Sequence, residues 1–191
     1  MRIAYAGAPG AFAHQACLAF AAECEPFPVD GFATVADAVE SGAAAAGMLP
    51  LRNSRAGPVE EVTQLLATRP LRIDAEHDLP VRMHLLGLPG AELGAVRTVI
   101  SHSMALRQCM EALVSLGVET RAAANTAVAA RDLSDPTCAV LASEAAAEAY
   151  GLVILRRDVH DDPGNVTRFA RVVCAEPKLP PSALPHFATL L

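Results

Sequence analysis

The sequence contains no tryptophan, and aromatic residues make up only 4% of its 191 residues. No apolar run approaches the ~20 residues that a bilayer-spanning helix needs, so we expect no membrane contact. Lysine and arginine form no cluster and the formal net charge is −6, which argues against nucleic acid as a partner. Membrane-spanning and nucleic-acid-binding proteins are therefore excluded as classes.

The cysteines lack the spacing of a disulfide framework or a zinc site. There are five of them, an odd number, with no Cys-x-x-Cys motif: Cys17, Cys24, Cys109, Cys138 and Cys174. The N-terminus enters a strand-like run at once and has no signal-peptide layout. We expect reduced thiols in a cytoplasmic protein, with neither a metal nor a cofactor.

What the sequence does contain is a regular alternation of strand and helix patterns. Hydrophobic residues make up 52% of the chain, enough for one core or for two small lobes. Short apolar runs such as Ile3 to Ala6 are followed by helical spacing such as Phe12, Ala16 and Phe20. This pattern predicts an α/β fold of two lobes joined by crossing strands. We expect residues 1–76 with 161–176 in lobe 1, 77–160 in lobe 2, and an extended tail over 177–191.

Several local features follow from the same patterns. The turn at Gly7 to Gly10 leads into a helix but matches no dinucleotide or phosphate motif, and His14 is expected at the surface. A capping-box spacing predicts a helix that begins near Thr34. A single helix is expected from about Ser103 to Ser115, with Gln108 off its apolar face.

Polar segments follow several of the expected strands. Arg52-Asn53-Ser54 follows one, Ser101-His102 ends another, and Asp161 to Phe169 leads into the last with a Pro-Gly turn. Thr167 and Arg168 would stand at a strand mouth, a good place to bind a small anion. Taken singly, these residues also fit helix caps, solvated positions, a surface ion pair or a plain turn.

Together the segments resemble the prephenate dehydratase family. Asp161-Asp162-Pro163-Gly164-Asn165-Val166-Thr167-Arg168-Phe169 resembles its Asp-Asp-Pro-x-Asn-x-Thr-Arg-Phe signature. Four further stretches match in order: Gly7 to Ala16, Leu49 to Ser54, Ser101-His102 with Gln108-Cys109, and Ala142 to Leu152. The resemblance covers roughly residues 1–175 and implies a fold like type II periplasmic binding proteins, with two lobes, a cleft and usually a homodimer. Family members commonly add a C-terminal ACT domain, which we expect to be missing here.

The family's reaction removes CO2 and a hydroxyl from a dianionic ring, so the protein must position the ring and stabilise charge. The resemblance implies that Thr167 donates a hydrogen bond to the leaving hydroxyl. Neutral donors would hold the carboxylates, Arg168 would attract the dianion, and Phe169 would be core or a wall beside the ring. The residues expected to bind substrate are Asn53, Ser54, Ser101, His102, Gln108, Arg168, Phe169 and Arg52.

Four positions depart from the family pattern: Ala11 and Ala13 replace hydroxyl residues, Arg52 replaces a glutamate and Ser103 a proline. Three functions therefore remain open. The first is a prephenate or arogenate dehydratase. The second is a non-aromatising prephenate decarboxylase, which Arg52 favours. The third is a non-catalytic small-anion binding protein, which Ala11 and Ala13 favour.

Overall fold

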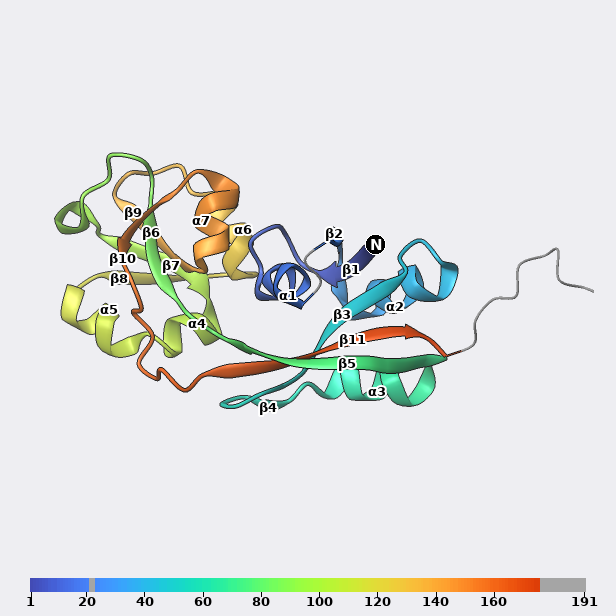
Figure 1. Ribbon diagram of the computed structural model, residues 1–191. Coiled ribbons are helices and arrows are strands. Elements are labelled where there is room, and N and C mark those ends of the chain that lie inside the picture. Colours follow the sequence, from blue (N-terminus) through green and yellow to red (C-terminus); the bar gives the residue numbers. More distant parts are fainter. Residues whose placement is uncertain (21–22, 176–191) are drawn as a thin grey trace, which may run out of the picture.

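The computed structural model describes residues 1–20 and 23–175, which form two lobes, each built on its own sheet (Figure 1). The first sheet has the order β2-β1-β3-β11-β5, with β4 paired to β3. Its strands are β1 (Arg2–Ala6), β2 (Glu25–Val29), β3 (Ala46–Asn53), β4 (Gly57–Pro58), β5 (Leu71–Pro80) and β11 (Val166–Cys174). Its helices are α1 (Phe12–Phe20), α2 (Gly31–Ser41) and α3 (Glu60–Thr68).

The second sheet has the order β10-β6-β9-β7-β8. Its strands are β6 (His84–Gly87), β7 (Thr98–His102), β8 (Glu119–Ala123), β9 (Cys138–Ala142) and β10 (Val153–Arg156). Its helices are α4 (Ser103–Arg107), α5 (Met110–Leu116), α6 (Thr126–Arg131) and α7 (Glu144–Tyr150), with a short 3-10 turn, η1 (Leu93–Ala95), ahead of β7. No helix in the described ranges is long and apolar enough to cross a membrane.

The two sheets repeat one plan. In the first, β1 lies parallel to both β2 and β3, and antiparallel β11 and β5 follow beyond β3. In the second, β7 lies parallel to β8 and β9, and antiparallel β6 and β10 follow beyond β9. α1 covers one face of the first sheet while α2 and α3 cover the other; α4 with α5, and α6 with α7, do the same for the second. The two-lobed α/β fold expected from the sequence is confirmed.

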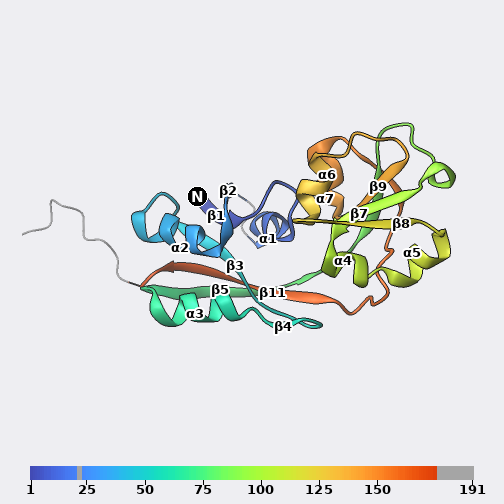
Figure 2. The same cartoon turned by 180° about the vertical axis from the view of Figure 1, so that it is seen from behind.

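The long strands β5 and β11 run side by side from lobe 1 towards lobe 2, as both views show (Figures 1 and 2). The chain leaves lobe 1 through β5 and returns through β11, so the signature segment lies at the crossing. The residue limits given above for the two lobes stay a prediction, and the expected tail over 177–191 lies outside the described residues. All five cysteines are free thiols.

Two local expectations were wrong, and one strand was not predicted. β2 carries Pro26 and Pro28, which an edge strand tolerates because one side of its backbone needs no sheet partner. α2 begins at Gly31 instead of near Thr34, whose hydroxyl donates to the main-chain oxygen of the N-cap residue Asp30 at 2.6 Å. The helix expected over 103–115 breaks at Gln108 and Cys109 into α4 and α5.

His14 is half-buried instead of exposed. Its ring stacks on Tyr5 with centroids 5.3 Å apart, and its Nδ1 accepts a hydrogen bond from Gly10 N at 3.0 Å. Burial lowers the pKa of His14. The histidine therefore stays a neutral acceptor that fixes the turn before α1.

Candidate active site

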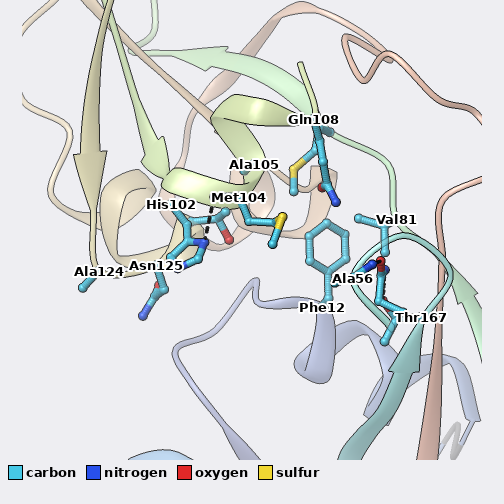
Figure 3. Close-up of a pocket in the computed structure, with 13 residues that line it drawn as sticks. Phe12, Ala56, Val81, His102, Met104, Ala105, Gln108, Ala124, Asn125 and Thr167 are labelled. Carbon is cyan, nitrogen blue, oxygen red and sulfur yellow. Dashed lines mark hydrogen bonds between the residues drawn. The ribbon is translucent and has the colours of Figure 1, made fainter. Parts of the chain in front are cut away.

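A cavity of about 390 Å³ lies between the lobes (Figure 3). Lobe 1 contributes the start of α1, the end of β3 and the start of β11. Lobe 2 contributes α4 and the start of α6, and the crossover after β5 closes one side. The lining residues are Phe12, Asn53, Ala56, Val81, Met83, His102, Met104, Ala105, Gln108, Ala124, Asn125, Thr126 and Thr167.

Thr167 faces this cavity with its hydroxyl fixed by Asn53. The two residues are direct partners on β11 and β3, and Asn53 Nδ2 donates to Thr167 Oγ1 at 2.9 Å. Asn53 Oδ1 accepts from the main-chain N–H groups of Arg55 (2.9 Å) and Ala56 (3.0 Å), which orients the amide. Because Asn53 can only donate at this contact, the Thr167 hydroxyl accepts there and keeps its own proton for another acceptor.

Arg52 and Arg168 lie on the opposite face of the same strands. They are cross-strand partners next to the Asn53–Thr167 pair, and successive side chains of a strand point to opposite faces. Arg168 makes a two-point ion pair with Asp78, at 2.8 Å for each contact, and the pair lowers the pKa of the Asp78 carboxyl. Arg52, Ser54 and Arg168 line a separate hollow on this face, so the structure does not bring them to the cavity.

Of the expected site residues in lobe 2, His102 and Gln108 line the cavity and Ser101 does not. Ser101 is fully buried and donates to Leu141 O at 2.7 Å, so its hydroxyl is used inside the sheet and does not line the cavity. His102 does line it; its Nδ1 accepts from Met104 N at 3.2 Å, the dashed line in Figure 3. Gln108 lines the cavity from the break between α4 and α5, and Figure 3 shows its side chain pointing towards Phe12.

Phe169 is 3% exposed and packs with Tyr5, Met48 and α1 in the core of lobe 1. Phe169 was expected either in the core or as a wall beside the substrate ring, and the structure places it in the core. The apolar walls come from residues that the sequence reasoning did not select, chiefly Phe12, Val81 and Met104. The turn before α1 was the available signal for Phe12, since it places the first helical residue above the strand end.

The side chains that line the cavity are polar and apolar in about equal number. In the described part of the chain its lining includes no aspartate, glutamate, lysine or arginine, and the polar groups are amides, a hydroxyl pair and one imidazole. No cluster of three or more histidine, cysteine or acidic residues suited to a metal ion occurs within the ranges 1–20 and 23–175. The lining therefore offers hydrogen-bonding groups set between apolar walls.

Residues 3–177 match the family described as prephenate dehydratase. The chain belongs to this family. The arogenate dehydratase/prephenate dehydratase 1 of Arabidopsis thaliana, a chloroplastic protein, is 36% identical over 100% of this chain and 49% of its own length. The arogenate dehydratase 1 of Petunia hybrida is 39% identical over 94% of this chain and 43% of its own length. This chain thus spans about half the length of the curated relatives it matches.

Solved structures agree with this assignment. The prephenate dehydratase from Arthrobacter aurescens, in complex with L-Phe, superposes with a TM-score of 0.84 at 29% identity, over 98% of this chain and 63% of that one. A structure described as GqqA, a novel type of quorum quenching acylase, superposes with a TM-score of 0.86 at 35% identity, over 95% of this chain and 67% of that one. The second structure is named for acyl-group hydrolysis, a reaction different from dehydration.

The departures from the prephenate dehydratase pattern lie outside the cavity lining. Ala13 is buried in the core of lobe 1, and Ala11 packs close to Gly7 in the turn before α1. Arg52 lies on the opposite face of β3, and Ser103 is exposed at the start of α4. The substitutions therefore leave the described walls around Thr167 unchanged in character.

Contacts on two sides hold the lobes together around the cavity. On one side, Ser143 Oγ donates to Gly10 O at 2.6 Å, and Tyr150 donates to Pro9 O at 2.8 Å. On the other, Asp161 accepts from the first N–H groups of α5, Met110 N at 2.9 Å and Glu111 N at 3.1 Å. A carboxylate at the N-terminus of a helix accepts hydrogen bonds from N–H groups that have no partner within the helix, and its negative charge interacts favourably with the helix dipole. Asp161 thereby explains the helix break.

Asp162, the second acid of the signature, turns back to lobe 1. It forms an ion pair with Arg55 in the turn after β3 and accepts from Gly164 N at 2.7 Å. Asp161 N also donates to Gln108 O at 2.8 Å. Asp161 thus ties the Gln108 wall to the segment before β11, whereas the Arg55–Asp162 pair is exposed and contributes little.

Proposed function

We propose that this chain is a prephenate dehydratase, which converts prephenate to phenylpyruvate with loss of CO2 and water. The single observation that supports this most is Thr167, held by Asn53 with its proton directed away from that amide in a half-apolar cavity. Family membership supplies the reaction class, and the geometry supplies a donor suited to it.

The reaction balances with one proton. The ring carboxylate leaves as CO2, its bonding electrons form the last double bond of the aromatic ring, and the ring hydroxyl departs with its own bonding electrons. Prephenate carries two negative charges, and phenylpyruvate and hydroxide carry one each, so a single proton, taken from solvent, converts the hydroxide to water. The hydrogen bond from Thr167 stabilises the charge that grows on the departing oxygen. Such stabilisation is strongest in a site that excludes water.

A threonine hydroxyl is too weak an acid to lose its proton fully at neutral pH, so we propose hydrogen-bond donation instead of proton transfer. Gln108, His102 and Asn125 are the polar groups of the lobe 2 wall that would orient the substrate carboxylates. Asn53 has both its donors and its acceptor engaged within the protein, and we propose that it positions Thr167 instead of binding a carboxylate.

Arogenate is the second candidate substrate of the same reaction, since several relatives are named arogenate dehydratases. The decarboxylase alternative loses its support, because Arg52 faces away from the cavity. Acyl-group hydrolysis needs a nucleophile with a base beside it. Among the described residues, the Thr167 hydroxyl is bonded to the Asn53 amide and to no histidine or carboxylate, which favours the dehydratase.

Product analysis tests these functions directly. The purified protein is incubated separately with prephenate, arogenate and an N-acyl amide, and the products are identified by mass. Phenylpyruvate from prephenate supports the proposal, and phenylalanine from arogenate alone supports the second candidate substrate. A hydroxylated cyclohexadiene indicates decarboxylation alone, a free acid indicates acylase activity, and binding without turnover indicates a binding protein; each of these three outcomes overturns it.

We further propose that the protein works in the cytoplasm as a homodimer. Five free thiols support a reducing compartment, and the family resemblance supports the dimer. Sedimentation equilibrium of the full chain tests the assembly, and a mass of one chain at micromolar concentration would contradict it.

A further inference from the structure

Asn165 stands immediately before β11 and is 3% exposed, which is unusual for an amide side chain. Its Oδ1 accepts a hydrogen bond from Asn53 Nδ2 at 2.8 Å. Its main-chain oxygen accepts from Val81 N at 2.8 Å, and Val81 belongs to the cavity wall. Asn165 itself does not line the cavity, yet it contacts two residues that do.

The hydrogen bonds of Asn53 explain why this contact matters. An asparagine side chain has two N–H donors. The two short contacts go to Asn165 Oδ1 at 2.8 Å and to Thr167 Oγ1 at 2.9 Å, and a longer one goes to Val166 O at 3.3 Å. The acceptor end of Asn53 is held by the following turn, so the amide is fixed at both ends.

We infer that Asn165 is a positioning residue, which acts through Asn53 to keep the Thr167 hydroxyl aimed into the cavity as a donor. This inference rests on the proposed dehydratase function. Without the Asn165 oxygen, one N–H of the half-buried Asn53 keeps only its longer contact to Val166 O at 3.3 Å, and the amide tilts or recruits water to satisfy it. The Thr167 oxygen then shifts with the amide. Misplacement of a reacting group by about 1 Å costs roughly a hundredfold in rate.

Two substitutions at this position separate the acceptor from the packing. Asn165→Leu keeps the side-chain size but removes the acceptor; we expect kcat to fall by about tenfold to a hundredfold with KM within about twofold, because the carboxylate ligands are untouched. Asn165→Asp keeps the acceptor and adds a negative charge near a dianion; we expect kcat within about threefold and a raised KM that salt lowers again.

Arg55→Ala is the matched control. This substitution removes the ion pair between Arg55 and Asp162. It keeps the main-chain N–H of residue 55, which donates to Asn53 Oδ1. We expect little change in kcat. Thermal unfolding of each variant shows whether it is folded, and Asn165→Ser replaces Asn165→Leu if the leucine variant is not, since the shorter serine cannot reach Asn53.

A second readout does not need activity. In a 15N-labelled sample the Asn53 side-chain NH2 group should exchange slowly with solvent, and quickly in Asn165→Leu. A kcat for Asn165→Leu within twofold of the unsubstituted protein, or an equal loss in Asn165→Asp, would overturn the inference. If the protein turns over neither prephenate nor arogenate, the proposed function fails. The exchange measurement still tests the positioning inference separately, because unchanged exchange of the Asn53 NH2 group in Asn165→Leu would overturn it.

Discussion

Gly10 lies where the two lobes meet most closely, and Gly10→Ala should separate them. Gly10 has φ +84, and a Cβ built there would lie 2.5 Å from the Ala146 Cα and 2.9 Å from the Ala146 N. Those atoms are main chain of α7 and cannot move as a side-chain end could. The substitution therefore adds left-handed backbone strain, about 1 kcal/mol, and overpacking, about 2 kcal/mol.

The control is Gly42→Ala at the end of α2. Gly42 has φ +78, but a Cβ there would meet nothing within 4 Å, so it carries the strain alone. For a protein of this size, 1 kcal/mol shifts Tm by about 2–4 °C. We expect Tm to fall by roughly 6–12 °C in Gly10→Ala and roughly 2–4 °C in Gly42→Ala.

Circular dichroism during heating measures both shifts, and KM for the substrate reports whether the lobes have moved apart. Equal Tm losses in the two variants, with KM unchanged in Gly10→Ala, would refute the close approach of Gly10 to Ala146. A Cβ at Gly10 would also lie 2.8 Å from the Ala146 Cβ, so a larger loss in Gly10→Ala that Ala146→Gly partly reverses would identify the contact itself.

Three further predictions concern single side chains. Thr167→Val, which keeps the shape and removes the hydroxyl, should lower kcat by about 10²–10³-fold with Tm little changed; product formation and heating measure the two, and near-normal kcat would remove Thr167 from the mechanism. Arg168→Ala should leave KM within about twofold, because its exposed pair with Asp78 lies outside the cavity, and a large rise in KM would return Arg168 to substrate binding. Burial lowers the pKa of His84, so stability present above the unfolded-state pKa of about 6.5 is lost as pH falls through the lower folded-state value. Tm should therefore drop as the pH falls below about 6.5. His84→Asn, whose amide oxygen can accept from Asp158 N as His84 Nδ1 does at 3.0 Å, should flatten that drop, and an equal drop in both proteins would contradict it.

Periodicity in the sequence was enough to predict the alternation of strands and helices and the return of the last strand to lobe 1. It missed β2, because Pro26 and Pro28 normally weaken a strand prediction and only an edge position tolerates them. It missed the break at Gln108 because the cap of α5 comes from Asp161, which is fifty residues away in the chain. A partner at that distance leaves no local pattern.

Only part of the site was predicted, because motifs identify polar residues but do not show which way each side chain points. Thr167 and Asn53 were recognised from motifs, and the structure brings them together. Arg52 and Arg168 were selected by charge, although strand alternation was a usable warning: if Thr167 faces the cleft, its neighbour must face away. The apolar wall at Phe12 has no chemical signature, so only the fold could identify it.

The position of β11 between β3 and β5 has a consequence for how the protein is made. Lobe 2 is a continuous stretch of chain, whereas lobe 1 keeps an open slot in the middle of its sheet until residues 166–174 leave the ribosome. Lobe 2 can thus finish folding before the sheet of lobe 1 is complete. The same strand brings Thr167, so a prematurely ended chain would lack a complete N-terminal sheet and the reactive hydroxyl together.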